Sequence, residues 1–592
     1  MLNKIKLILI LTIMSEMVNA QQKINFNISF TEPQAHYVGV NMKVSGYKKE
    51  YVDVRMPVWT PGSYLVREFA KNVEEVAATS GSKKLDVRKL NKNTWRVYSK
   101  NADFDFNYRV YCFEISVRTS FVDDSHAFLS STGIFMNIDN QIRQPVTVHV
   151  APFKGWEKIS TGLELVRGKQ NTYYAPDFDI LYDSPFEIGN QDIFHFTASG
   201  VDHEVAMYGG GNYDKTNLQR DMAKIVEQET AIYGENPNKH YTFIVHNYNV
   251  GSGGLEHLNS TVLGASRNAY ATEAGYLNFL RLSAHEYFHL WNVKRLRPKA
   301  LGPFDYNNEN YTTNLWIAEG FTAYYDKLMV HRAGLQSSEG YLSALATDIS
   351  TLENQPGKDI QPLSESSFDA WIKLYRPNEN TKNSSISYYN KGAMIAFLLD
   401  LAIINSTNAS KKLDNVMHDA YHEFYKKLNR GYTDQEFKAI LEKTAGISFG
   451  EFYKDYINGL KPLDYNKYLG YAGFTLENTA VKNEPYLGIE TTKRNDRLVV
   501  SNVWRGTGAW DGGLNVNDEI VAVDDVHISA DDLAKIIAGK QVGDKISVQV
   551  LRDGLLKDLS VVLKENPLAR FKISPVANPS VKQLAVRKKW LE

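Results

Sequence analysis

Two histidines and a glutamate lie close together in the segment SAHEYFHLW, residues 283–291. The order is His285, Glu286, two further residues and His289, so the imidazoles are four residues apart. On a helix both imidazoles share one face and can bind one ion, while Glu286 lies about 100° around the axis, within reach of a water on that ion. The residue types and spacing predict a zinc-hydrolase site. The alternative is a helix with two partly buried histidines and no metal.

The flanking sequence favours a helix over residues 276–293, because this segment holds no proline and Pro298 follows it. Zinc also needs a third protein ligand and an open position for water. The apolar helical segment 314–328, NLWIAEGFTAYYDKL, offers Glu319, because a carboxylate in such surroundings is costly unless it is paired or bound to metal. Asp326 shares the helical face of Glu319, where it either accepts the second N–H of a ligand histidine or is a solvated residue.

The composition is that of an ordinary soluble globular protein, with 43% hydrophobic and 23% charged residues among 592. A formal net charge of −1 provides no global field that favours nucleic acid, so we expect no nucleic-acid partner. Cys112 is the only cysteine, which excludes intramolecular disulfides and a cysteine-ligated zinc site. Any metal site must therefore use His, Glu and Asp.

The first twenty residues have the pattern of a secretory signal peptide. Lys4 and Lys6 precede an apolar run, and the segment ends in Val-Asn-Ala at residues 18–20. The run is far shorter than the ~20 residues that span a bilayer, which argues against a membrane anchor. We expect an exported protein, periplasmic or secreted, without an integral membrane span.

The spacing of apolar residues divides the rest of the chain into several domains and predicts a multidomain α+β protein. Short alternating runs predict an N-terminal β-sandwich-like domain over residues 21–190. Helical patterns dominate residues 191–470, and strands around a short helix return over residues 480–565. Residues 566–592 form a basic C-terminal tail that is either loosely ordered or packed on a neighbouring part.

Three segments together resemble the glycyl aminopeptidase family of zinc metallopeptidases. They are HEYFHLWNVKRLRP, LWIAEGFTAYYDKL and the earlier MPVWTPGSYLVREFAKNVEEV. The resemblance covers nearly the whole mature chain and implies a β-rich N-terminal domain, a thermolysin-like, mainly helical catalytic domain and a C-terminal PDZ domain. In the wider aminopeptidase N clan eighteen residues follow the second histidine before the glutamate ligand, whereas 29 residues separate His289 from Glu319 here.

The segment VGSGGLEHLNST is similar to the exopeptidase motif of that clan, in which a glutamate holds the free α-ammonium of the substrate. The matching residue is Glu256, and glycines at 253 and 254 would let a peptide backbone approach closely. The alternative is a glycine-rich turn with a surface glutamate. His257 stands where the clan has asparagine, and its role stays open.

The segment SISYYNKGAMIAF resembles the Tyr-x-Lys-Gly segment of the clan, and this register selects Tyr389, with Tyr388 as its rival. A phenol there can donate to the oxyanion of the tetrahedral intermediate. The alternative is an aromatic residue that packs at a helix start.

The order of strands and helix after residue 480 looks like a PDZ domain, with Tyr486, Leu487, Gly488 and Ile489 as its carboxylate-binding loop. Such a groove takes a peptide as an added strand. The module either binds a peptide C-terminus or an internal segment, or is docked and structural.

These expectations combine into an exported aminopeptidase with one zinc ion per chain, held by His285, His289 and Glu319. Glu286 acts as general base, and the resemblance implies peptide substrates with a free, small N-terminal residue, glycine or alanine. The alternatives are a zinc endopeptidase, in which Glu256 does not close the subsite, and a non-catalytic PDZ-type binding protein with a vestigial zinc site.

Overall fold

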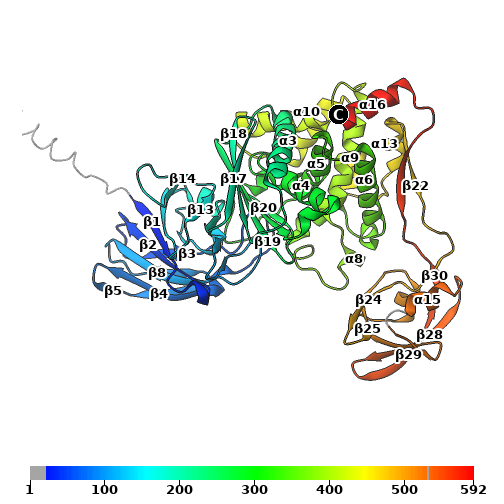
Figure 1. Ribbon diagram of the computed structural model, residues 1–592, viewed down its shortest axis with the longest axis horizontal. Coiled ribbons are helices and arrows are strands. Elements are labelled where there is room, and N and C mark those ends of the chain that lie inside the picture. The colour runs from blue at the N-terminus through cyan, green and yellow to red at the C-terminus, as the bar shows by residue number, and fades with distance from the viewer. Residues whose placement is uncertain (1–21, 530–531) are drawn as a thin grey trace, which may run out of the picture. The chain divides into compact units, whose positions relative to one another are not determined.

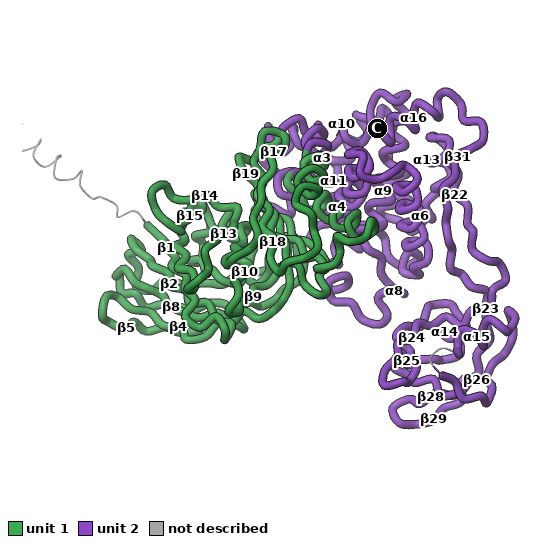
Figure 2. The backbone as a smooth tube through the Cα atoms, viewed as in Figure 1, with its two compact units in different colours: residues 1–226, 236–290, 303–310 green, residues 227–235, 291–302, 311–592 purple. Residues whose placement is uncertain are grey.

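The computed structural model describes residues 22–529 and 532–592 (Figure 1). The predicted signal peptide, residues 1–20, lies outside the described residues. Two compact units divide the chain (Figure 2). The first comprises residues 1–226, 236–290 and 303–310, and the second comprises residues 227–235, 291–302 and 311–592. Within the described ranges, no helix has both the length and the apolar character needed to cross a membrane.

Unit 1 begins with the predicted β-rich domain, which consists of three sheets around one apolar core. Side chains alternate between core and solvent along strands such as β1, as the sequence pattern requires. The eight-stranded sheet has the order β14 (Glu164–Leu165), β15 (Thr172–Ala175), β12 (Val146–Ala151), β1 (Lys23–Ser29), β2 (Tyr37–Ser45), β8 (Phe104–Tyr111), β4 (Val73–Ser80) and β5 (Lys83–Leu85).

Two four-stranded sheets complete this domain. One is β13 (Lys158–Thr161), β16 (Phe186–Gly189), β10 (Ala127–Leu129) and β9 (Phe121–Val122). The other is β11 (Asn137–Ile138), β3 (Val52–Arg55), β7 (Thr94–Val97) and β6 (Val87–Asn91).

A further five-stranded sheet in unit 1 carries the glycine-rich motif at its edge. Its order is β17 (Asp192–Ala198), β18 (Val201–Tyr208), β19 (His240–Tyr248), β21 (Ser260–Ser266) and β20 (Gly254–Glu256). The inner strand β19 is buried over its whole middle and carries Phe243, Ile244 and Val245 at its centre. Helix α4 (Glu273–Phe288) packs against β20 and β21, so the predicted metal helix lies beside the predicted substrate strand.

Helix α4 is shorter than predicted, because it ends at Phe288 and not at residue 293. His289 is its C-cap and keeps helical dihedral angles, so the four-residue relation to His285 is preserved. Beyond the helix, Asn292 donates hydrogen bonds to the carbonyl oxygens of Ile317 and Ala318. The backbone itself continues in turns, in which the amide of Leu290 bonds to the carbonyl oxygen of Tyr287 and the amide of Leu296 to that of Trp291, and apolar periodicity alone does not reveal these turns.

Unit 2 is mainly helical, and its central helix is α9 (Tyr388–Ser406), which is buried along almost its whole length. Around it lie η6 (Trp316–Phe321, a π-helical segment), α5 (Thr322–Arg332), α6 (Ser338–Glu353), α7 (Leu363–Phe368), α10 (Leu413–Ala420), α11 (Asp434–Ala445), α13 (Tyr465–Tyr471) and α16 (Val581–Leu591). The short α8 (Thr381–Ser384) precedes α9. Helix α3 (Lys215–Tyr233) separates β18 from β19 in the chain.

The predicted PDZ module has its own apolar core and lies within unit 2. Its sheet has the order β24 (Ile489–Arg494), β25 (Arg497–Val503), β26 (Glu519–Val523), β28 (Lys545–Arg552) and β29 (Leu555–Val562), with β27 (Val526–His527) paired to β26. Helices α14 (Gly508–Gly512) and α15 (Leu533–Ala538) and the short pair β23 (Pro485–Tyr486) and β30 (Lys564–Glu565) complete it.

The basic tail is ordered and packed, which is the second of the two expected states. Strand β31 (Phe571–Pro575) pairs with β22 (Phe474–Asn478), and α16 then packs against α9. Trp590 is fully buried and its indole N–H donates to the hydroxyl of Tyr324 at 3.0 Å. The architecture confirms the predicted multidomain α+β fold, with its β-rich N-terminal domain, helical middle region and C-terminal PDZ module.

Candidate active site

The two motif histidines converge at the end of α4. Thr272 caps the start of this helix by accepting a hydrogen bond from the amide of Gly275 at 3.1 Å. The Nε2 atoms of His285 and His289 lie 3.2 Å apart. Zinc–nitrogen bonds of about 2.0–2.1 Å at tetrahedral angles place two ligand nitrogens about 3.3 Å apart. This pair therefore has the geometry that a zinc ion needs from two imidazoles.

Helix α4 is fixed at this position by the phenol of Tyr287, inside the motif. The hydroxyl of Tyr287 lies 2.9 Å from Nε2 of His203 on β18 and accepts a hydrogen bond from the side chain of Asn236 at 2.7 Å. Tyr287 is buried. A buried hydroxyl with two polar partners orients its helix strongly, since loss of either partner would leave a desolvated polar group.

Glu286 and Glu256 face each other across the gap between α4 and β20. Their carboxylates and the imidazole of His289 each provide an oxygen or nitrogen atom, and these atoms lie within 4.8 Å of one another. All three residues are buried. Two carboxylates so close in a buried site repel each other unless a cation lies near them.

Glu256 has an incomplete set of hydrogen bonds in this site. It is 3% exposed, and its Oε1 atom has no hydrogen-bond partner among the described residues. Leaving a buried carboxylate oxygen unpaired is costly, so the arrangement calls for a donor that the described residues do not supply. An ammonium group has the required charge and donors.

Glycines bring the surrounding backbone into contact with both acids. A Cβ atom built on Gly254 would lie 2.2 Å from Oε1 of Glu286. A Cβ atom built on Gly62 would lie 2.5 Å from Oε2 of Glu256, and Gly62 also has a positive φ of 84°. Any other residue at either position would displace an acid or the backbone beside it.

Gly62 belongs to the N-terminal domain and was not among the predicted site residues. It lies in the quoted segment MPVWTPGSY, where Pro61-Gly62 is a turn signal. That signal predicts a turn but not the distant carboxylate that the turn touches. The predicted Gly253 has a positive φ of 84°, a backbone conformation that glycine adopts more readily than other residues.

His257 holds the end of strand β20 in place. Its Nδ1 atom lies 3.1 Å from the carboxylate of Asp183, which also accepts a hydrogen bond from the amide of Leu258 at 2.8 Å. These bonds fix the residues that follow Glu256, so the side chain of His257 helps to position the end of β20.

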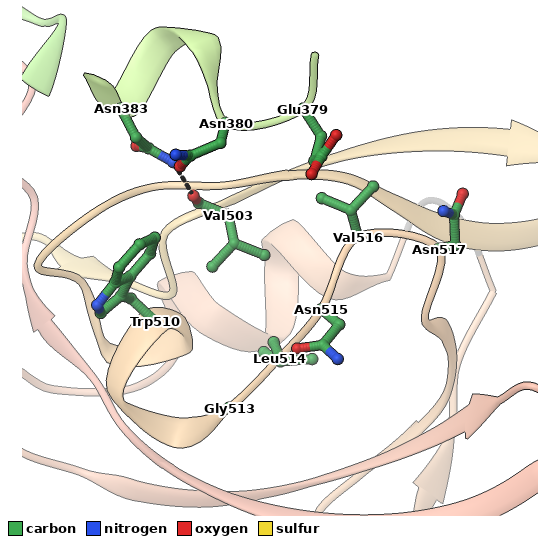
Figure 3. Close-up of a pocket in the computed structure, with 10 residues that line it drawn as sticks. All are labelled: Glu379, Asn380, Asn383, Val503, Trp510, Gly513, Leu514, Asn515, Val516 and Asn517. Carbon is green, nitrogen blue, oxygen red and sulfur yellow. Dashed lines mark hydrogen bonds between the residues drawn. The ribbon is translucent and has the colours of Figure 1, made fainter. Parts of the chain in front are cut away.

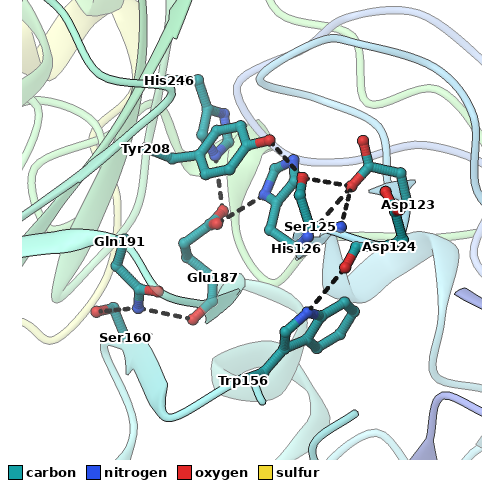
Figure 4. Close-up of polar contacts among 10 residues, drawn as sticks. All are labelled: Asp123, Asp124, Ser125, His126, Trp156, Ser160, Glu187, Gln191, Tyr208 and His246. Carbon is teal, nitrogen blue, oxygen red and sulfur yellow. Dashed lines mark hydrogen bonds and ion pairs between the residues drawn. The ribbon is translucent and has the colours of Figure 1, made fainter. Parts of the chain in front are cut away.

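A buried polar cluster joins the N-terminal domain to the five-stranded sheet inside unit 1 (Figure 4). Glu187 on β16 lies 2.7 Å from Nδ1 of His126 and 2.8 Å from Nε2 of His246 on β19. Tyr208 on β18 stacks on the ring of His126, with centroids 3.4 Å apart. Burial alone would raise the pKa of Glu187, but the two histidines outweigh it and hold that pKa below its usual range.

Glu319 lies in unit 2, on the π-helical segment η6, and is 2% exposed. Its helix contacts α9 through two glycines. A Cβ atom on Gly320 would lie 2.5 Å from the Cα atom of Gly392, and one on Gly392 would lie 2.8 Å from the carbonyl oxygen of Trp316. This contact brings the start of α9 close to Glu319.

Tyr389 lies in the first turn of α9, near Glu319. Burial and the negative charge of Glu319 raise the pKa of Tyr389 well above its usual value, so its phenol stays protonated. Its hydroxyl lies 3.3 Å from that of Tyr375. Tyr388 stacks on it but is completely buried, whereas Tyr389 keeps some exposure, which favours Tyr389 as the residue that can meet a ligand.

Asp326, on α5, is 8% exposed and therefore not a solvated helix residue. Lys327 forms an ion pair with it, with Nζ at 3.5 Å from Oδ1. Its suggested bond to a ligand histidine stays a prediction.

The PDZ module contacts the segment before α9 in unit 2 (Figure 3). Asn383 donates to the carbonyl oxygen of Val503 at 2.8 Å and accepts from the amide of Arg505 at 2.9 Å. Lys382 forms an ion pair with Glu490 at 3.0 Å. The same segment and the PDZ module border an open hollow of about 790 Å³.

The predicted carboxylate loop of the PDZ module is a tight turn. Tyr486 ends β23, Leu487 and Gly488 form the turn, and Ile489 begins β24, the edge strand of the sheet. Gly488 has a positive φ of 90° and packs against Thr507, which leaves no room for a side chain. An unpaired edge strand beside such a turn is suited to peptide addition.

Comparisons with known proteins agree with the fold. Three family models match: the Peptidase M61 N-terminal domain over residues 25–190, M61 glycyl aminopeptidase over residues 278–395, and the PDZ domain over residues 485–563. A solved aminopeptidase N family protein from Idiomarina loihiensis is 30% identical, with a TM-score of 0.90, and the match covers 96% of this chain and 100% of that one. No curated protein matches the chain.

Two other solved structures are similar at lower identity. A mutant M1 zinc metallopeptidase from Deinococcus radiodurans, bound to a Tyr-Ser-Ala substrate, is 12% identical, with a TM-score of 0.48 and coverage of 75% of this chain and 95% of that one. Aminopeptidase A of Legionella pneumophila, in complex with aspartic acid, is 12% identical, with a TM-score of 0.49 and coverage of 94% and 57%.

The converging histidines, the buried acid between them and the adjacent edge strand define a metallopeptidase. The family models and the Idiomarina structure identify the family within the metallopeptidases. The chain belongs to the M61 glycyl aminopeptidase family, with an appended PDZ domain. Family membership and the imidazole pair both suggest zinc as the cofactor.

Proposed function

We propose that the protein is an exported zinc-dependent aminopeptidase that removes a small N-terminal residue, glycine or alanine, from peptides. One observation carries the proposal: Glu256 is a buried carboxylate whose Oε1 atom has no hydrogen-bond partner among the described residues, beside Glu286 and His289. An α-ammonium group at that carboxylate places the first peptide bond next to Glu286. Cleavage there releases one residue.

His285, His289 and Glu319 would hold one zinc ion per chain, a donor set of two imidazoles and one carboxylate that suits this metal. The 3.2 Å separation of the two Nε2 atoms supports this assignment, as does the burial of Glu319. When bound, zinc supplies Lewis acidity that polarises a carbonyl and lowers the pKa of water.

The chain's own residues divide the remaining work. Glu286 accepts the proton of the attacking water and delivers it to the leaving amine. Tyr389, whose phenol is protonated at neutral pH, donates a hydrogen bond to the oxyanion. Glu256 selects the free amine, while Gly253 and Gly254 let the substrate backbone lie along β20.

The turn around Gly62 supports a preference for small N-terminal residues. It lies directly against the carboxylate of Glu256, so it limits the space around the substrate's first residue. The wall comes from the N-terminal domain, which ties that domain to substrate choice.

A comparison of free and blocked peptides tests the function. The zinc-loaded protein should hydrolyse glycyl and alanyl amides, lose this activity to a chelator, and leave N-acetylated versions intact. Hydrolysis of the acetylated peptides at equal rates would identify an endopeptidase instead. Glu286→Gln should abolish turnover. If the native full-length protein itself hydrolyses none of these substrates, the result would point to a non-catalytic PDZ-type binding protein.

Substitution of Glu256 tests the carrying observation. Glu256→Gln keeps the shape and removes the charge, and a charged hydrogen bond contributes about 1.5–3 kcal/mol, so kcat/KM should fall about tenfold to a hundredfold. Export is tested separately, by locating the protein after cell fractionation and sequencing its mature N-terminus, which should be near Gln21.

A further inference from the structure

The outer edge of strand β20 is occupied by an arginine from the N-terminal domain. The carbonyl oxygens of Gly253 and Leu255 both point toward β21, where they accept from the amide of Gly264 and the hydroxyl of Thr261. Carbonyl groups alternate along a strand, so that of Gly254 points to the open edge. There it accepts a hydrogen bond from Nη2 of Arg118 at 3.1 Å.

Arg118 is held firmly at this edge. Its neighbour Val117 is buried in a small apolar cluster with Leu255, the residue that follows Gly254. A Cβ atom on Gly253 would lie 3.6 Å from Nη1 of Arg118, so the guanidinium also lies beside the second glycine of the motif. The loop and the strand therefore form one packed unit.

The charge of Arg118 has no counterpart in the described part of the chain. The side chain is half-buried and forms no ion pair there, and its Nε atom is buried without a hydrogen-bond partner. Its hydrogen bond to Gly254 uses one donor of a group that has five. A half-buried guanidinium with spare donors is suited to a carboxylate, which it binds in a bidentate manner.

The spacing along β20 matches the length of a short peptide. Glu256 and Gly254 are two residues apart, or about 6.6 Å along a strand. An extended dipeptide spans about 7 Å between its ends. With its ammonium at Glu256 and its scissile bond at Glu286, the carboxylate of a dipeptide would therefore reach the vicinity of Arg118.

We propose that Arg118 binds the C-terminal carboxylate of dipeptide substrates, which makes the protein a dipeptide-preferring aminopeptidase. This inference rests on the proposed function and specifies its substrate class. Arg118 has two effects at the edge: it supplies the cation that a dipeptide's free end needs, and it occupies the carbonyl group that a longer peptide would use for continued pairing along β20.

Three substrates test the proposal with the zinc-loaded full-length protein: glycylglycine, glycylglycine amide and triglycine. We expect kcat/KM for glycylglycine to exceed that for its amide by about tenfold or more, chiefly through a lower KM, because only the free acid can form the charged pair. Triglycine should be hydrolysed less efficiently than glycylglycine.

Arginine variants assign the effect. In Arg118→Gln the ratio of free acid to amide should fall to about one, whereas Arg118→Lys should keep part of it because the charge remains. The ratio of kcat/KM for the free acid to that for the amide is the readout, because Arg118 also positions Gly254 and its loss can lower the activity toward both substrates. Arg88→Gln, on an exposed site of β6, is the matched control and should keep the native ratio.

Each outcome is decisive. Equal hydrolysis of glycylglycine and its amide by the native protein overturns the proposal and leaves the aminopeptidase function standing. A preference for the free acid that persists in Arg118→Gln also overturns it, because another group must then bind the carboxylate. If the protein cleaves none of the three substrates and no other peptide with a free N-terminus, both the proposed function and this inference are overturned.

Discussion

Gly320→Ala tests the close packing between η6 and α9. A Cβ atom at this position would lie 2.5 Å from the Cα atom of Gly392 and 2.9 Å from the carbonyl oxygen of Tyr388. Both atoms belong to the backbone, so no side-chain rotation relieves the contact. The Cα atom would have to retreat by about 0.9 Å to reach an ordinary contact of 3.4 Å.

The loss of activity should exceed the loss of stability. Overpacking costs about 1–3 kcal/mol, and the better helix propensity of alanine offsets about 1 kcal/mol of it, so the net cost is at most about 2 kcal/mol. Glu319 and Tyr389 lie on the two segments that are forced apart. A misplacement of about 1 Å at a catalytic group costs about a hundredfold in rate, so kcat should fall by that order.

Three measurements on the zinc-loaded variant check this prediction: kcat with a glycyl amide, bound zinc per chain, and the midpoint of urea unfolding. Gly470→Ala is the control, because no heavy atom lies within 4 Å of a Cβ atom at that position. If Gly320→Ala keeps native kcat and native zinc content, the glycine contact does not align the two residues, and the reasoning is refuted.

Three further predictions concern stability. Glu187→Gln should be less stable than the native protein near neutral pH, and this difference should shrink below about pH 4. The reason is that a carboxyl group with a lowered pKa in the folded state contributes stability above its unfolded pKa and loses that contribution as the pH falls through its folded pKa. Urea titrations at several pH values can follow the difference. Trp590→Ala should cost about 3–5 kcal/mol in urea unfolding, because the indole is fully buried, and an unchanged midpoint would show that α16 contributes nothing. Asn383→Ala should leave two polar groups of the PDZ contact unpaired, at about 1–3 kcal/mol, so the amide of Arg505 should exchange hydrogen faster; native exchange would contradict this.

The local part of the site was predictable because a helix translates spacing into geometry. His285 and His289 are four residues apart, and their Nε2 atoms converge to 3.2 Å even though α4 ends before the second histidine. Gly253 and Gly254, before and at the start of β20, were predictable for a similar reason, since a positive φ or a close backbone approach requires them. Both inferences need only a few consecutive residues.

The end of α4 and the state of the tail were harder to predict. After Phe288 the backbone bonds become those of turns, and Asn292 bonds to carbonyl groups of a distant segment, neither of which apolar periodicity encodes. The tail has the basic composition of an exposed segment, yet Trp590 is buried against α9 and Tyr324. The signal of that packing was small: Val586 and Trp590, four residues apart in a charged helix, are the two buried residues of α16.

Gly62 and Arg118 show why the proposed substrate choice was the least predictable property. Neither belongs to a motif with chemistry of its own, and each acts through a residue far along the chain. The catalytic groups can be inferred from spacing, because the reaction demands particular residue types. The walls of the substrate site demand only shape and charge at the right distance, which many sequences satisfy, so they emerge only when the N-terminal domain is folded against β20. Variation in this domain should therefore change which peptides are cleaved while the hydrolytic groups stay the same.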